Sequence, residues 1–87
     1  MAIVFIPAQL RELTAGVQQV ELPAASVRDV VRELEARFPG IAARLSQGEG
    51  LIPGWAVSID GAMTNKGLLA RVGPASEVHF LPAIGGG

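Results

Sequence analysis

The stretch SVRDVVRELEARFPG, residues 26–40, predicts one amphipathic α-helix. Ser26 is a typical N-cap residue, and Asp29 places a negative charge in the first turn, where the helix dipole favours it. The Pro-Gly pair at 39–40 ends the helix. Apolar residues recur at the spacing of a single helical stripe: Val27, Val30, Val31, Leu34 and Phe38. One face of a helix over about residues 26–38 must therefore be buried against another layer.

Short apolar runs on either side of this helix predict β-strands. AIVFIPA is rich in β-branched residues and stops at a proline, and VQQVEL lies close enough to be its hairpin partner. After the helix, the residues of WAVSID and SEVHFLP show the alternation of side chains that is typical of a strand. Strands are therefore expected at residues 2–8, 17–22, 55–60 and 76–82. Segments 9–16 and 47–54 are expected to be loops, and 63–74 to be irregular with room for one short strand.

This order of elements predicts an α+β domain, with a mixed sheet of four to five strands and one main helix. Only one long amphipathic element is present, so that helix must cover the sheet. A ferredoxin-like split fold would need a second long helix. Residues 63–74 do not supply one, because they offer only short apolar contacts at Leu68, Leu69 and Val72. Two hairpin-like halves flanking a diagonal helix make a β-grasp, or ubiquitin-like, arrangement over residues 1–82.

Composition excludes several classes of function. The chain has 87 residues, of which 49% are hydrophobic and 17% charged, with a net charge of -1. No basic cluster is present, so no nucleic-acid partner is expected. Without cysteine there is no disulfide, thiolate metal site or cysteine nucleophile, and no metal is expected. The N-terminal apolar run AIVFI is too short for a signal or membrane segment, so we expect a cytoplasmic protein with no membrane partner.

The sequence offers no group of residues suited to an enzyme that acts alone. The single histidine, His79, lies within the last predicted strand, on the face opposite Val78 and Phe80, and is expected to be a surface or half-buried residue. Glu33 and Glu35 point apart on the helix and do not make an acid–base pair. No phosphate-binding loop is present.

The end of the chain, HFLPAIGGG, is the most unusual feature. Pro82 cannot donate a ladder hydrogen bond, so strand pairing should stop there. Residues 83–87 are then expected to form a flexible glycine-rich tail that reaches at most about 17 Å. A terminal carboxylate is a poor electrophile and would need activation, for instance adenylation, by another enzyme. The glycines alone leave two interpretations open, a reactive arm and an uninvolved terminus.

Three stretches resemble the β-grasp sulfur-carrier family. IPAQLRELTAG (6–16) is similar to the family's first strand and following loop. SVRDVVRELEARFPGIAARL (26–45) is similar to its helix, and EVHFLPAIGGG (77–87) to its last strand, proline and terminal di-glycine. The family includes the small subunit of molybdopterin synthase, the thiazole-pathway carrier and the cysteine-pathway carrier.

The resemblance implies a chemical role for the C-terminus. In this family the last glycine is adenylated by a ubiquitin-activating-type adenylyltransferase and becomes a thiocarboxylate that delivers sulfur to an acceptor enzyme. Carried over, Gly87 is the reacting residue and Gly86 the second glycine of the motif. Gly85 is an additional glycine that should be tolerated. No cofactor is expected to be bound, because the partner uses the ATP and the sulfur is carried at the C-terminus.

The resemblance also implies a docking face on the open side of the sheet. Phe5, Pro7 and Leu81 match docking positions in the molybdopterin-type carriers, which would leave Val4 and Ile6 facing the core. The strand is apolar on both faces, so alternation alone does not decide this. The partner-binding set is completed by three residues at the end of the chain: Pro82, Ile84 and Gly85.

Two other functions stay open at this point. The same fold and tail suit a ubiquitin-like modifier joined to lysines, and the open apolar face suits a non-catalytic β-grasp binding module. The acceptor pathway, whether for molybdopterin, cysteine, thiazole or a natural product, is not assigned by the sequence.

Overall fold

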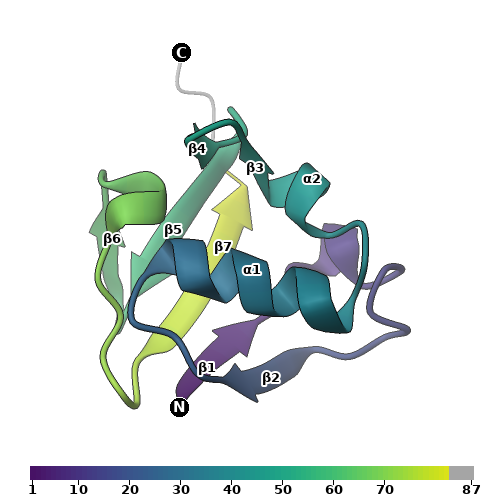
Figure 1. Ribbon diagram of the computed structural model, residues 1–87, viewed down its shortest axis with the longest axis horizontal. Helices are drawn as coiled ribbons and strands as arrows, with labels where there is room; N and C mark the ends of the chain where they lie inside the picture. The colour runs from purple at the N-terminus through teal and green to yellow at the C-terminus, as the bar shows by residue number, and fades with distance from the viewer. Residues whose placement is uncertain (83–87) are drawn as a thin grey trace.

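Five strands form one mixed sheet in the order β2-β1-β7-β5-β6, in the computed structural model, which describes residues 1–82 (Figure 1). At its centre, β1 (Ala2–Phe5) and β7 (Glu77–Pro82) run parallel. On the far side of β1, β2 (Gln19–Leu22) pairs antiparallel. The first and last strands are therefore neighbours, as the predicted β-grasp arrangement requires.

The other half of the sheet is an antiparallel hairpin. β5 (Trp55–Ile59) pairs with β7 on one side and with the short edge strand β6 (Ala62–Thr64) on the other. The turn between them contains Asp60 and Gly61, with φ values of 53° and 85°. Both residues lie in the left-handed region, as a tight hairpin turn requires. This confirms the predicted mixed sheet with one main helix.

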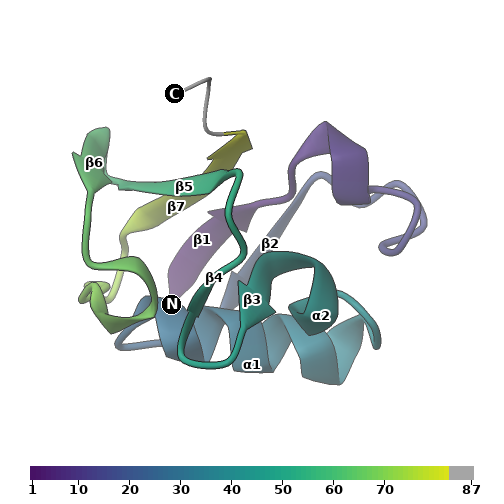
Figure 2. The same cartoon turned by 90° about the horizontal axis from the view of Figure 1, so that it is seen from above.

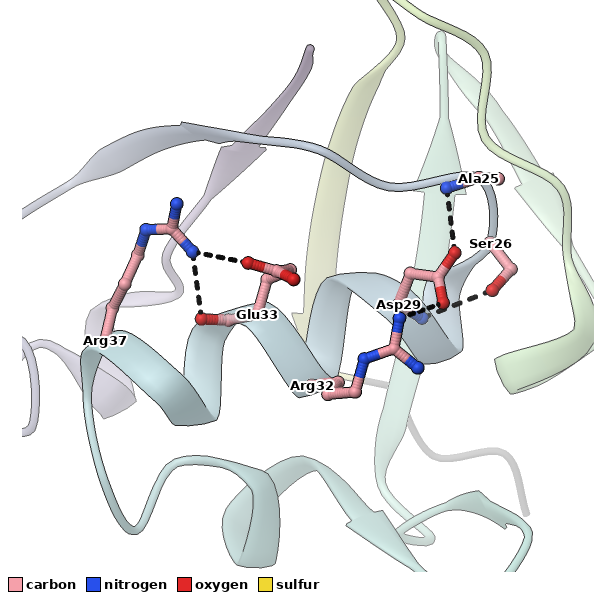
Figure 3. Close-up of polar contacts among 6 residues, drawn as sticks. All are labelled: Ala25, Ser26, Asp29, Arg32, Glu33 and Arg37. Atoms are coloured by element: carbon pink, nitrogen blue, oxygen red, sulfur yellow. Dashed lines mark hydrogen bonds and ion pairs between the residues drawn. The ribbon is translucent and has the colours of Figure 1, made fainter.

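The main helix, α1 (Val27–Arg37), confirms the prediction for residues 26–38. The Ser26 hydroxyl accepts a hydrogen bond from the Asp29 amide at 3.2 Å, and the Asp29 carboxylate accepts one from the Ala25 amide at 3.0 Å (Figure 3). Two donors at the helix start are thereby satisfied by neighbouring side chains. The helix ends at Arg37, and the amide of the next residue, Phe38, donates to the Leu34 carbonyl.

The solvent-facing side of α1 carries two ion pairs. Arg32 contacts Asp29 at 2.7 Å, and Arg37 contacts Glu33 at 2.9 Å (Figure 3). Both pairs join residues one turn apart, and exposed pairs of this kind add little to stability, because water and salt screen them. The opposite side of the helix contributes more to the stability of the fold, because it is buried against the sheet.

The core lies between α1 and one face of the sheet. On that face Val4, Ile6, Val78 and Phe80 are buried. The helix buries four residues of its apolar stripe: Val27, Val30, Val31 and Leu34. Leu81, in contrast, is 37% exposed on the opposite face. The expected assignment of Val4 and Ile6 to the core is thus confirmed.

Three segments expected to lack regular structure contain short elements. After α2 (Ala42–Leu45), β3 (Ser46–Gln47) and β4 (Gly50–Leu51) form a two-stranded hairpin, so the prediction of a loop over 47–54 was wrong. Gly48, with φ 61°, permits its tight turn. Strands of two residues are too short to produce a periodic pattern, which is why the sequence did not reveal them.

The other two segments each contain a 3₁₀ turn. Residues 9–16, expected as a loop, overlap η1 (Ala8–Leu10). Within 63–74, β6 is the short strand that was anticipated, and η2 (Gly67–Leu69) follows it. In η2 the predicted contact at Leu69 was wrong, because this side chain is 69% exposed. A 3₁₀ turn places adjacent residues on different sides, so Leu68 is buried and Leu69 is not.

The two faces of the main sheet differ in cover. Seen from above, α1, α2 and the β3–β4 hairpin all lie on one side of the sheet, while η1 rises beyond the end of β1 on the other (Figure 2). The sheet therefore has an open face bordered by η1, and the predicted docking residues are expected on this face.

Within the described residues, none of the helices is long and apolar enough to cross a membrane.

Candidate functional site

One row of side chains crosses the open face of the sheet. The registers place Phe5 opposite both Gln19 and His79, and Ser58 opposite both His79 and Met63. Residues opposite one another on adjacent strands point to the same face. The row therefore includes one residue from each strand, and its centre, on the two parallel strands, is Phe5 and His79.

Phe5 and His79 form a stacked aromatic pair. Their ring centroids are 4.1 Å apart and their planes differ by 3°. Both side chains are half-buried, as expected for His79. Because the two planes are nearly parallel, the stack places two aligned rings at the centre of the open face. The sequence analysis missed this pair because its two members come from opposite ends of the chain.

A groove of about 320 Å³ lies beside this stack. Its lining residues come from the end of β1 and the segment after it, from the start of β2 and from β7. Its lining includes all three predicted docking residues of the strands, Phe5, Pro7 and Leu81. Pro7 is buried and supplies mainly a wall, whereas Leu81 is exposed. The structure thus gathers these three residues in one place, and their docking role stays a prediction.

Arg11 also lines this groove, and the sequence analysis did not single it out. Its Nε donates a hydrogen bond to the Ile6 carbonyl at 3.3 Å, which holds the half-buried side chain against the end of β1. The Arg11 carbonyl accepts hydrogen bonds from the Gly16 amide at 2.9 Å and from the Thr14 amide at 3.2 Å. The segment that carries Arg11 is therefore fixed by its own backbone.

The glycine-rich end of the chain follows the strand that borders this groove. β7 pairs as far as Pro82, which lies opposite Trp55. The Trp55 indole N–H donates to the Arg44 carbonyl at 2.9 Å and joins this end of the sheet to α2. Four further predicted site residues lie outside the described residues: Ile84, Gly85, Gly86 and Gly87.

Three carboxylates have a lowered pKa because each accepts hydrogen bonds from backbone amides. Backbone amides of Gly40 and Ala42 lower the pKa of Glu35, and the amide of Glu77 lowers that of Asp60. The Ala25 amide lowers the pKa of Asp29. Each carboxylate fixes a turn or a helix end. Within residues 1–82, no three His, Asp or Glu side chains are grouped so that they could hold a metal.

Comparisons with known proteins agree with this description. The model of the ThiS family matches residues 4–87. A chain of the BexX/CysO complex from Amycolatopsis orientalis is 34% identical, with full coverage of both chains and a TM-score of 0.90. CysO from Mycobacterium tuberculosis is 26% identical over 97% of this chain and 100% of that chain, with a TM-score of 0.86.

A third similar structure is a protein modifier. Small archaeal modifier protein 1 from Methanosarcina acetivorans is 25% identical over 99% of this chain and 95% of that chain, with a TM-score of 0.77. No curated protein sequence matches the chain. The family match covers nearly the whole length, and the similar structures share the β-grasp fold. The chain belongs to the ThiS family, among the β-grasp sulfur carriers and ubiquitin-like small modifiers.

Proposed function

We propose that this chain is a sulfur carrier whose C-terminal glycine carboxylate is adenylated and then converted to a thiocarboxylate. The observation that carries the proposal is the match of the ThiS family model through Gly87, which includes the whole Gly-Gly-Gly sequence after β7. The 34% identity to a chain of the BexX/CysO complex supports the same role. The chain acts as a cosubstrate of partner enzymes and is not an enzyme itself.

The chemistry takes place at one carbonyl carbon. In the first step a carboxylate oxygen of Gly87 attacks the α-phosphorus of ATP, pyrophosphate leaves, and an acyl adenylate forms. In the second step hydrosulfide attacks the carbonyl carbon, the bond to AMP breaks, AMP leaves with the electron pair, and the proton goes to solvent. Sulfur thereby replaces one oxygen. A glycine end suits both steps, because it has no Cβ to obstruct a narrow enzyme channel.

The partner enzymes supply what the chain lacks. A ubiquitin-activating-type adenylyltransferase binds ATP and shields the adenylate from water, and a biosynthetic acceptor enzyme takes the sulfur. One similar structure is a complex with a second protein, BexX, which supports the use of a partner of this kind. We place the reaction in the cytoplasm, where ATP and reduced sulfur are available.

Intact-mass spectrometry tests the proposal. The chain is incubated with the activating enzyme, ATP and sulfide, and its mass should increase by the difference between a sulfur and an oxygen atom. Deleting Gly86 and Gly87 together should abolish the increase, while Gly85→Ala should retain it. An unchanged mass with an enzyme that loads a ThiS-family relative in the same assay would refute the proposal.

A second candidate function is conjugation to proteins. The similarity to small archaeal modifier protein 1 favours it. In this case the acyl adenylate, or a thioester made from it, reacts with a lysine amine and forms an isopeptide bond. Peptide mass spectrometry should then find glycine remnants on lysines of other proteins. Lys66, the only lysine of the chain, is exposed and would be the only internal site for self-conjugation.

A further inference from the structure

A second groove, of about 250 Å³, lies between α1, the β3–β4 hairpin and η2. Arg28 and Arg32 line it from α1, and Glu49 lines it from the hairpin turn. Val31 and Leu68, which are both buried, supply its apolar wall. Because α1 and the hairpin lie on the covered side of the sheet (Figure 2), this helix-side groove shares no lining residue with the groove on the open face.

Basic residues gather around the helix-side groove. Arg28 and Arg32 are four residues apart and therefore lie on the same side of α1. Lys66 immediately precedes η2, which packs against α1 and β4. Arg71 lies beside the start of α1, because it pairs with Ser26 in an isolated β-bridge. Four of the seven basic residues of the chain thus surround one groove.

Acidic residues are fewer in the same segments. Asp29 and Glu49 are the two that lie there, of eight in the chain. Asp29 already pairs with Arg32 at 2.7 Å and accepts a hydrogen bond from the Ala25 amide, so its charge is used at the start of the helix. The surface around the groove is therefore net positive, in a chain whose net charge is -1.

Three of these cations have no anionic partner in the described part of the chain. The ion pairs within residues 1–82 use Arg32 and Arg37. Arg28, Lys66 and Arg71 are exposed, and their side chains form neither of these pairs. Exposed cations of this kind attract an anionic partner without an internal ion pair having to break first.

The apolar part of the groove indicates which kind of anion it suits. Val31 and Leu68 form a wall between the charged residues, and the next residue of η2, Leu69, is 69% exposed. A small inorganic anion gains nothing from an apolar wall, because it binds through hydrogen-bond donors and charge. A protein segment uses both, since protein interfaces combine an apolar centre with a polar rim.

We propose that the helix-side groove binds an acidic segment of a partner protein. One apolar side chain of that segment packs against Val31 and Leu68, and carboxylates on either side of it pair with Arg28 and Lys66. Charge complementarity with the net positive surface supports this occupant. The proposal goes beyond the carrier function and does not depend on it, because the groove uses neither the open face nor the C-terminus.

A nuclear magnetic resonance titration of the full ¹⁵N-labelled chain tests the proposal. The probe is the synthetic peptide Glu-Asp-Leu-Asp-Glu with both ends blocked. Amide signals of α1 near Arg28, of Gly48 and of Leu68 should shift, whereas those of Phe5 and His79 should not. A peptide with lysine in place of every acidic residue should not bind. A peptide with serine in place of leucine should bind less tightly, because it loses the apolar contact.

Charge variants of the chain measure the contribution of single residues. Arg28→Gln should weaken peptide binding about threefold, and Arg28→Glu about tenfold, because the reversed charge repels the peptide. Glu49→Gln should strengthen binding about twofold, since it removes a carboxylate that lines the groove. The matched control is Arg44→Gln, which changes an exposed arginine of α2 outside the groove lining and should leave the affinity unchanged. The amide spectrum of each variant verifies that it is folded.

Several results would overturn the proposal. The first is a peptide that does not bind, or that binds the wild type and Arg28→Gln equally. Shifts of the same size around Arg37 and Arg44 would show that the peptide responds only to exposed charge. Inorganic phosphate that displaces the peptide and shifts the same amides would identify a site for small anions. A wild-type dimer that Arg28→Gln converts to monomer would identify a second copy of the chain as the occupant.

Discussion

At the scale of single residues, carboxylates hold the turns of this protein in place. Glu35 accepts hydrogen bonds from the amides of Gly40, at 3.0 Å, and of Ala42, at 2.9 Å, and so joins the end of α1 to α2. Asp60 accepts one from the Glu77 amide at 2.9 Å and joins the β5–β6 turn to β7. Each carboxylate is favoured in its charged form, because an anion accepts from amides more strongly than a neutral acid.

The pH dependence of stability should report on Glu35. Its two amide contacts lower its pKa from the ordinary value of 4.5. The charged form therefore stabilises the fold above this pH, and the stabilisation disappears as the pH falls through the lowered pKa. Glu35→Gln should melt at a lower temperature than the wild type at pH 7, and the difference should shrink below about pH 4.

A matched control distinguishes this effect from a general loss of charge. Glu49 is an exposed carboxylate in the β3–β4 turn. The melting temperature of Glu49→Gln should equal that of the wild type at every pH. Differential scanning calorimetry across the pH range measures all three proteins. A gap between the wild type and Glu35→Gln that widens in acid would contradict the assigned role of Glu35.

At the scale of elements, β7 has one side in the core and one side on the open face of the sheet. Val78 and Phe80 are buried under α1, while His79 and Leu81 lie on the open face with the groove. The alternation is a direct consequence of strand geometry, in which successive side chains point to opposite faces. One strand therefore carries core residues and groove-lining residues in turn.

Two adjacent substitutions in β7 should have opposite consequences. Phe80→Ala removes a ring that is 3% exposed and should lower the free energy of unfolding by about 3–5 kcal/mol. Leu81→Ser changes a side chain on the open face and should alter this free energy by less than about 1 kcal/mol. Urea titration measures both. A large loss of stability in Leu81→Ser would show that the open face is covered.

The start of α1 offers a further test at this scale. Ser26→Ala removes the hydroxyl that accepts from the Asp29 amide, and should lower the free energy of unfolding by about 1 kcal/mol. Ser26→Thr keeps a hydroxyl at the same position and should retain most of the stability. Chemical denaturation followed by circular dichroism compares the two, and an equal loss in both variants would argue against the cap.

At the scale of the whole molecule, one core connects all the main elements. Residues from β1, β7, β5 and α1 belong to the same buried cluster, and Ile41 and Leu45 extend it under α2. The Cα radius of gyration is 11.7 Å. No element has a separate core of its own within the described residues, so the domain should unfold as one cooperative unit.

The single tryptophan allows this cooperativity to be measured. Trp55 packs against the core and bonds to the Arg44 carbonyl, so its fluorescence reports on the sheet and α2, whereas far-ultraviolet circular dichroism is dominated by α1. The two urea transitions should coincide. Leu34→Ala, at the buried face of α1, should shift both equally by about 2–5 kcal/mol. Separate midpoints would show that α1 and the sheet unfold independently.

Local sequence patterns were sufficient to predict the elements in which apolar residues recur at a regular spacing. The helix from Ser26 to Phe38 and the strand ending at Pro82 were predicted because helical and strand periodicity depend on neighbours in the chain. The family resemblance, confirmed by the match over residues 4–87, allowed the β-grasp fold to be named, whereas the docking positions that it implied stay a prediction. The β3–β4 hairpin and the exposure of Leu69 were not predicted, because such short elements leave no periodic pattern.

The sequence by itself determined the helix, the strand alternation, the class of fold and the glycine-rich C-terminus. Only the tertiary structure decided which side chains meet on the open face. Phe5 and His79 stack because β1 and β7 pair in a particular parallel register, and Arg11 joins them because the segment after β1 folds back against its end. These contacts depend on pairing between distant parts of the chain, and periodicity within one segment contains no information about that register.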